Sequence, residues 1–152
     1  MSGKTIATMI TMFIFVLFFL FSITYSLHKK IELKVDTVSY NVIETVSTNG
    51  KLSSQLYGYL KDSIGKYGDY TIIVKLEEQI RPGIYDTHYD TSYIIDKNLK
   101  IGDKMSIYLE DRNLSLFGRL INASIFGVAG SDSLIDSRIK SIKTAIISKN
   151  GD

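Results

Sequence analysis

Three side chains of a metal-binding type alternate in one short stretch, at Asp86, His88 and Asp90. Alternate residues of a β-strand share a face, so two carboxylates and an imidazole would converge there, and such groups bind divalent ions. The same alternation also arises on an ordinary solvated strand face. Because His88 is the only histidine after residue 30, we favour the solvated face and expect no metal or other cofactor.

The remaining motif-like stretches carry less chemistry. Ser131, Asp132 and Ser133 with Asp136 could form a cation loop, but the stretch lacks the ordered oxygen ligands and distal Glu of a calcium loop. Residues 127–130 do not lead from a strand into a helix as a dinucleotide fingerprint does. Glycosylation triplets begin at Asn113 and Asn122. Since the sequence has no nucleophile elbow, phosphate loop or zinc-helix motif, we expect a protein that is not an enzyme.

Charge is distributed unevenly along the 152 residues. All 16 acidic residues follow Lys30, whereas three of the 18 basic residues lie at or before it, which leaves the rest of the chain with a net charge of −1. Nucleic-acid binding needs a concentrated basic face, so we expect no nucleic-acid partner. The absence of cysteine excludes disulfides and thiolate metal sites.

The dominant element is the segment 5–27, which contains no charged residue, proline or glycine. As a helix it would reach roughly 34 Å, enough to cross a hydrocarbon core of about 30 Å. The apolar run is longer than that of a cleaved signal and ends without a small-residue cleavage site. We therefore predict a retained single-pass anchor in the cell membrane over residues 1–27. The N-terminus would be cytoplasmic, and residues 28–152 would form an extracytoplasmic α+β domain.

Residues 28–47 fit two structures. Apolar residues follow helical spacing, yet residues 31–36 alternate as in a strand. We expect a helix, because a helix already nucleated in the membrane segment extends more easily than a new one begins. A break at 47–50 is followed by an amphipathic helix over 51–65.

A small antiparallel sheet is expected over residues 70–148, with strands at 71–77, 85–95, 105–109 and 141–148. The segment 114–126 fits either a short helix or two short strands. On a strand over 85–95, three tyrosines would share one face and could contact a partner: Tyr85, Tyr89 and Tyr93.

This order of parts resembles the type IV pilin-like proteins, most closely the TadE-like pseudopilins, and also short membrane-anchored proteins of bacterial conjugative elements. The local traces are residues 45–50 followed by 52–60, the turn at 101–103 and the loop at 130–132. The resemblance implies a pilin-like fold that packs against other pilin-like subunits or secretion-apparatus membrane proteins. It places the contact surface on the N-terminal helix, at Thr8, Met12, Phe15, Phe19, Val35, Val38 and Val42.

Pilin-like chains are typically cut after a glycine and carry Glu at the fifth mature position. In this chain the cut would fall between Gly3 and Lys4, and Thr8 stands where Glu is expected. The resemblance implies a non-enzymatic component of a bacterial pilus, secretion or conjugation apparatus. The alternative is a single-pass anchored binding module that contacts a partner or polymer through its tyrosine-rich face.

Overall fold

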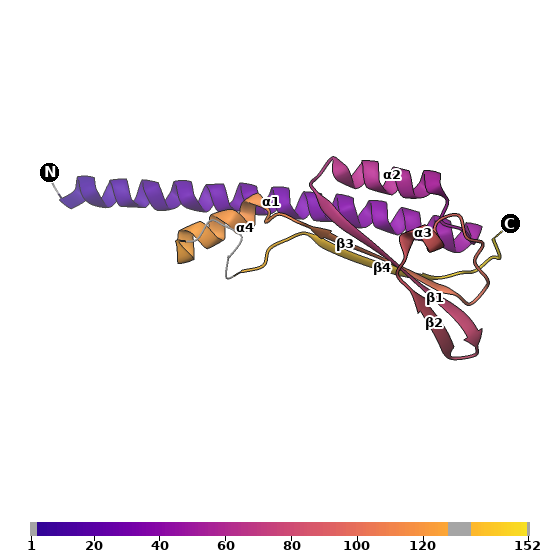
Figure 1. Ribbon diagram of the computed structural model, residues 1–152. Helices are drawn as coiled ribbons and strands as arrows, with labels where there is room; N and C mark the ends of the chain where they lie inside the picture. Colours follow the sequence, from indigo (N-terminus) through magenta and orange to yellow (C-terminus); the bar gives the residue numbers. More distant parts are fainter. Residues whose placement is uncertain (1–2, 128–134, 152) are drawn as a thin grey trace. The chain divides into compact units, whose positions relative to one another are not determined.

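The computed structural model describes residues 3–127 and 135–151. The loop noted at 130–132 and the possible cation loop at 131–133 lie outside the described residues, as does most of 127–130. The described chain has an α+β fold (Figure 1). It divides into two compact units, Met1–Lys30 with Leu114–Ser137 and Ile31–Asn113 with Arg138–Asp152. The expected anchor therefore shares its unit with the later segment 114–137 and does not form a unit alone.

Helix α1 runs without a break from Gly3 to Asn49, which confirms the helix predicted for 28–47 and excludes the strand alternative. Within its apolar part, hydroxyls donate hydrogen bonds to carbonyls four residues back, as from Thr8 to Lys4 and from Thr24 to Leu20, both at 2.9 Å. These bonds satisfy the polar groups inside the helix, as an apolar environment requires. The helix ends before Gly50, which has a φ of 66° and donates its N–H to the Val46 carbonyl.

The second unit is built on a four-stranded antiparallel sheet (Figure 1). Its strands are β1 (Tyr70–Arg81), β2 (Ile84–His88), β3 (Lys104–Asp111) and β4 (Lys140–Ile146), in the order β2-β1-β3-β4. Helix α2 (Ser54–Gly65) begins at Ser53, whose hydroxyl accepts a hydrogen bond from the Leu56 N–H. It starts later than the predicted residue 51 because Lys51 instead forms a β-bridge with Asn98.

One face of the sheet packs against the C-terminal part of α1 and against α2. The core contains alternate residues of the central strands and one stripe from each helix: Val35, Val42, Val46, Leu60, Ile64, Val74, Leu76, Met105, Ile107 and Leu109. The opposite face of the sheet exposes Ile73 and Ile142, on either side of Tyr108. The unit thus has a single core that covers only one side of the sheet.

In two segments the sequence pattern either predicted the wrong secondary structure or fitted two alternatives. The strand predicted for 85–95 is confirmed over 85–88 and wrong beyond it, because β2 (Ile84–His88) ends there and helix α3 (Thr91–Ile94) follows. The Asp90 carboxylate starts this helix by accepting a hydrogen bond from the Ser92 N–H at 2.9 Å. In 114–126 the helix alternative is confirmed: α4 (Leu116–Ile121) continues into the π-helix η1 (Asn122–Phe126).

Candidate functional site

The three side chains considered as a possible metal site do not converge. Asp86 and His88 lie on β2, with the His88 Nε2 3.5 Å from the nearest Asp86 oxygen, but Asp90 caps α3 instead. Among the described residues, no group of three His, Cys, Asp or Glu side chains is placed to hold a metal ion. The second carboxylate near His88 belongs to Glu78 of β1, at 3.7 Å. Sequence reasoning missed Glu78, because its proximity depends on strand pairing with Asp86.

A cation and an aromatic ring lie beside Glu78 and His88. We call the set Glu78, His88, Tyr93 and Lys97 the Glu78 cluster. The Lys97 ammonium pairs with Glu78 and lies 3.7 Å from the centroid of the Tyr93 ring, which in turn lies 4.7 Å from the His88 ring. Burial opposes the charge on Lys97, but hydrogen bonds to Glu78 and Tyr93 raise its pKa. The cluster thus contains an ion pair between Lys97 and Glu78. This ion pair and the contact between the Tyr93 and His88 rings hold α3 and the residues after it against β1 and β2. We interpret the cluster as structural.

The three tyrosines predicted to share a strand face lie on different elements, so that prediction is wrong. Tyr85 is on β2 beneath the Lys104 ammonium, at 4.3 Å, whereas Tyr93 is on α3 beneath Lys97. Tyr89 lies in the connection between them and is exposed. The chain leaves the strand after His88, which ends the period-2 pattern on which the prediction depended.

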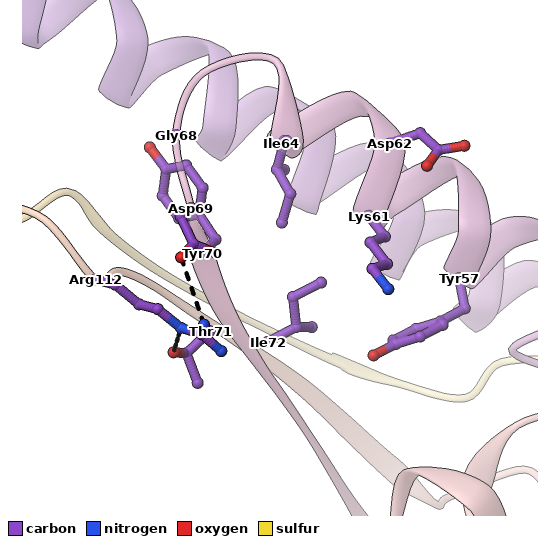
Figure 2. A pocket seen from close by; sticks show the side chains of 11 residues that line it. Tyr57, Lys61, Asp62, Ile64, Gly68, Asp69, Tyr70, Thr71, Ile72 and Arg112 are labelled. Atoms are coloured by element: carbon purple, nitrogen blue, oxygen red, sulfur yellow. Dashed lines mark hydrogen bonds and ion pairs between the residues drawn. The ribbon is translucent and has the colours of Figure 1, made fainter.

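A groove of about 540 Å³ lies between the end of α2 and the start of β1. Figure 2 shows Lys61 and Ile64 reaching from α2 toward Ile72 of β1, with Arg112 at the other end. Its lining residues are Tyr57, Lys61, Asp62, Ile64, Gly65, Gly68, Asp69, Tyr70, Thr71, Ile72 and Arg112. This lining includes no serine, cysteine or histidine.

Three polar residues of this groove are engaged with one another, whereas the buried Tyr70 hydroxyl has no hydrogen-bond partner within the described part of the chain. The Arg112 guanidinium donates to Thr71 Oγ1 at 3.2 Å and to Asp69 Oδ2 at 3.4 Å (Figure 2). Burial and the nearby charge of Asp111 raise the pKa of Tyr70 to about 12. Tyr70 therefore stays protonated at neutral pH and is not an activated base.

The residues assigned to the helical contact surface divide into two groups. Thr8, Met12, Phe15 and Phe19 are exposed, with 58% to 71% of the surface of the last three accessible. Val35 and Val42 are fully buried in the core of the second unit, and Val38 is partly buried against it. The valines are therefore occupied by intramolecular packing, which corrects the expectation for Val35 and Val42. Gly3 and Lys4, the predicted processing site, form the exposed first residues of α1.

Among the described residues, α1 is the one helix that is long and apolar enough to cross a membrane, and none of its most apolar stretch is buried within the chain. Length and composition thus agree with single-pass anchoring. No protein-family model, curated protein or solved structure matches this chain.

Proposed function

We propose that this chain is a non-enzymatic, pilin-like subunit of a bacterial pilus, secretion or conjugation apparatus, anchored by α1 and assembled through it. The observation that carries the proposal is that the two parts of one uninterrupted helix have different surroundings. Its C-terminal part supplies Val35, Val42 and Val46 to the core of the second unit, whereas no residue of the most apolar stretch in its N-terminal part is fully buried. A helix of this kind can anchor a subunit in lipid and later pack against other copies.

The exposed residues of the contact surface form one stripe. Thr8, Met12, Phe15 and Phe19 follow one another at intervals of four, three and four residues, which places them on the same side of a helix. The Thr8 hydroxyl donates to the Lys4 carbonyl at 2.9 Å, so the stripe presents no unsatisfied donor at this position. An apolar stripe that leaves lipid must be buried against another apolar surface, and neighbouring helices of the same kind supply one.

The orientation is part of the proposal: the short N-terminal tail is cytoplasmic and the second unit lies outside the membrane. The second unit contains the sheet and its core, and tyrosine and β-branched residues are common in its strands. A protease added to intact spheroplasts should therefore degrade the second unit.

Cross-linking tests the stripe directly, because the chain has no cysteine of its own. Phe15→Cys places a thiol on the stripe, and Ile10→Cys places one roughly 140° around the helix at a similarly exposed position. In native membranes we expect a thiol-reactive cross-linker to join Phe15→Cys chains to each other far more than Ile10→Cys chains. Equal cross-linking at both positions, or none at either, would contradict assembly through this stripe.

A second candidate function is an anchored binding module, and the outer face of the sheet favours it. Ile73, Tyr108 and Ile142 lie opposite one another on three adjacent strands of that face, and both isoleucines are exposed. Exchanging residues 5–27 for an unrelated membrane helix separates the two functions. A subunit that assembles through α1 should lose its place in surface fractions sheared from the cells, whereas a tethered module should keep binding its partner.

A further inference from the structure

One face of helix α4 and its continuation η1 packs against later residues of the same chain. The Asn122 side chain donates to the Gly118 carbonyl at 2.9 Å and to the Ile135 carbonyl at 3.1 Å, and it accepts from the Ile135 N–H at 3.1 Å. Gly118 lies so close to Ser137 that an added Cβ would overlap the serine hydroxyl. The Asn122 side chain is therefore satisfied internally by Gly118 and Ile135, and Ser137 packs against Gly118.

The rest of the segment is apolar and largely uncovered. Leu116 and Ile125 expose 66% and 64% of their surface, and Leu120 and Ile121 are partly exposed between them. The segment 116–126 contains no acidic residue and one basic residue, Arg119. An exposed patch of large apolar side chains is typical of a surface that contacts a membrane or another protein.

This segment adjoins the anchor at the end of the predicted membrane span. The Phe117 ring meets the Tyr25 ring edge-on, with centroids 5.2 Å apart, and lies 5.8 Å from the His28 ring. Both segments belong to the same compact unit, and Figure 1 shows α4 beside α1. Because Tyr25 and His28 stand where the apolar run gives way to Lys29 and Lys30, this contact fixes the first turn of α4 at the membrane boundary.

One side of α1 carries a row of partly buried residues. Four residues on one side of α1 are partly buried while residues around them are exposed: Leu17, Phe21, Thr24 and His28. From Leu17 to His28 the helix rises roughly 16 Å, and the eleven residues of α4 and η1 would span a similar length. This side lies opposite the stripe that contains Phe15 and Phe19, so the stripe remains uncovered.

We propose that α4 and η1 form a second membrane element, which enters the bilayer beside α1 and places its apolar face against the lipid acyl chains. The proposal rests on the proposed function to the extent that α1 must itself lie in a bilayer. A length of roughly 16 Å equals about half of a 30 Å hydrocarbon core, so the segment reaches toward the mid-plane of one leaflet. Ile125 is then the deeper end, and Leu116 lies near the headgroups.

The polar residues of the segment fit this placement. Asn122 has hydrogen-bond partners for both of its side-chain groups, which removes the largest cost of placing an amide in hydrocarbon. Arg119 lies in the first turn, roughly 4–5 Å along the helix from Leu116, and its long side chain can return the guanidinium to the headgroup region. Gly127 ends the segment in the left-handed conformation, with a φ of 67°.

Depth measurements on single spin labels test this placement. Full-length chains that carry Ile125→Cys, Leu116→Cys, Phe18→Cys or Tyr59→Cys would each be labelled with a nitroxide. They would then be reconstituted into vesicles of phosphatidylcholine and phosphatidylglycerol. Accessibility to oxygen, which enriches in hydrocarbon, is compared with accessibility to a water-soluble nickel chelate. Phe18 reports on the anchor, and Tyr59, exposed on α2, reports on a surface in water.

We expect the oxygen-to-nickel ratio at Ile125 to match that at Phe18 and to exceed that at Tyr59 on the order of tenfold, because a charged chelate is excluded from hydrocarbon. Leu116 should give an intermediate value. If Ile125 matches Tyr59 while Phe18 stays protected, the segment lies in water and the inference fails although the anchor stands. If the label at position 18 is also accessible to the nickel chelate, α1 does not lie in the bilayer and the proposal of membrane anchoring is refuted.

Two further outcomes would also overturn the inference. Equal ratios at Ile125 and Leu116 would mean that the segment lies flat at the surface of the membrane. A label at Ile125 shielded from both oxygen and nickel would mean that a second protein copy, and not lipid, covers this face.

Discussion

Replacing Gly50 by alanine tests the junction where α1 ends and two later segments of the chain meet it. Gly50 has a φ of 66°, and its carbonyl accepts a hydrogen bond from the Leu99 N–H at 2.8 Å. A Cβ at this position would overlap the backbone of Lys149 and Gly151 and lie 2.6 Å from the carbonyl carbon of Asn150. Because the neighbouring atoms are backbone atoms, no side-chain rotation can relieve the overlap.

The expected loss of stability has two parts. A non-glycine residue in the left-handed conformation costs about 1–2 kcal/mol. Displacing residues 148–151 also weakens the hydrogen bonds from Ser148 N–H to Ser47 and from Gly151 N–H to Leu99, at 3.0 and 2.9 Å. Each such bond contributes about 0.5–1.5 kcal/mol. We therefore expect Gly50→Ala to lower the free energy of unfolding by about 2–5 kcal/mol.

Gly83→Ala is the matched control. Gly83 has a φ of 81°, but a Cβ there would meet no atom within 4 Å, so this variant should show only the conformational cost of about 1–2 kcal/mol. Thermal unfolding of the full-length protein in detergent, followed by circular dichroism, measures both variants. For a domain of this size, each kcal/mol corresponds to roughly 4–8 °C in Tm.

A third variant isolates the overlap itself. In a chain that lacks residues 149–152, Gly50→Ala should cost no more than Gly83→Ala does, because the overlapping atoms are gone. The reasoning is refuted if Gly50→Ala and Gly83→Ala lower Tm equally in the intact chain. It is also refuted if removal of the tail leaves the cost of Gly50→Ala unchanged.

Three further predictions concern the second unit. Burial opposes the charge of Asp36, but hydrogen bonds from Lys143 and a neighbouring serine lower its pKa below the ordinary 3.8. In urea unfolding, Asp36→Asn should therefore lose less than about 1 kcal/mol at neutral pH, and the loss should vanish as the pH falls through the lowered pKa. Leu60→Ala should cost about 2–5 kcal/mol in the same assay, whereas the exposed neighbour Tyr59→Ala should cost less than about 0.5 kcal/mol. Because the pKa of Tyr70 is raised to about 12, the folded protein loses stability as the pH rises above about 10. Tyr70→Phe should therefore become more stable relative to the native chain between about pH 10 and pH 12.

The sequence predicts α1, α2 and three of the strands because their apolar periods are long. Residues 31–36 alternate like a strand, yet they continue α1, since the helix nucleated by residues 5–27 extends through them. The dipeptide Pro82-Gly83 is a typical turn signal, and it lies between β1 and β2. These features depend on local residues and so leave a local signal.

The features that the sequence did not reveal depend on distant contacts. The alternation from Tyr85 to Tyr93 hides the end of β2, because the Asp90 side chain can start a helix as readily as it can face solvent on a strand. The ion pair of Lys97 with Glu78 requires the paired strands to bring α3 back to β1. Val35 and Phe15 both look like contact residues in sequence, and only the sheet shows that Val35 is already covered.

The position of β4 has a consequence for biosynthesis. The strand completes the sheet beside β3, and the Ser148 N–H that follows it bonds to the Ser47 carbonyl at the end of α1, 101 residues earlier. At about 5–20 residues per second, a ribosome needs roughly 5–20 s to make that intervening chain. During this interval the apolar segment of α1 can already enter the membrane, while Val35, Val42 and Val46 still lack the strands that will bury them. A chaperone that acts on this protein should therefore bind the nascent chain between the emergence of α1 and that of β4.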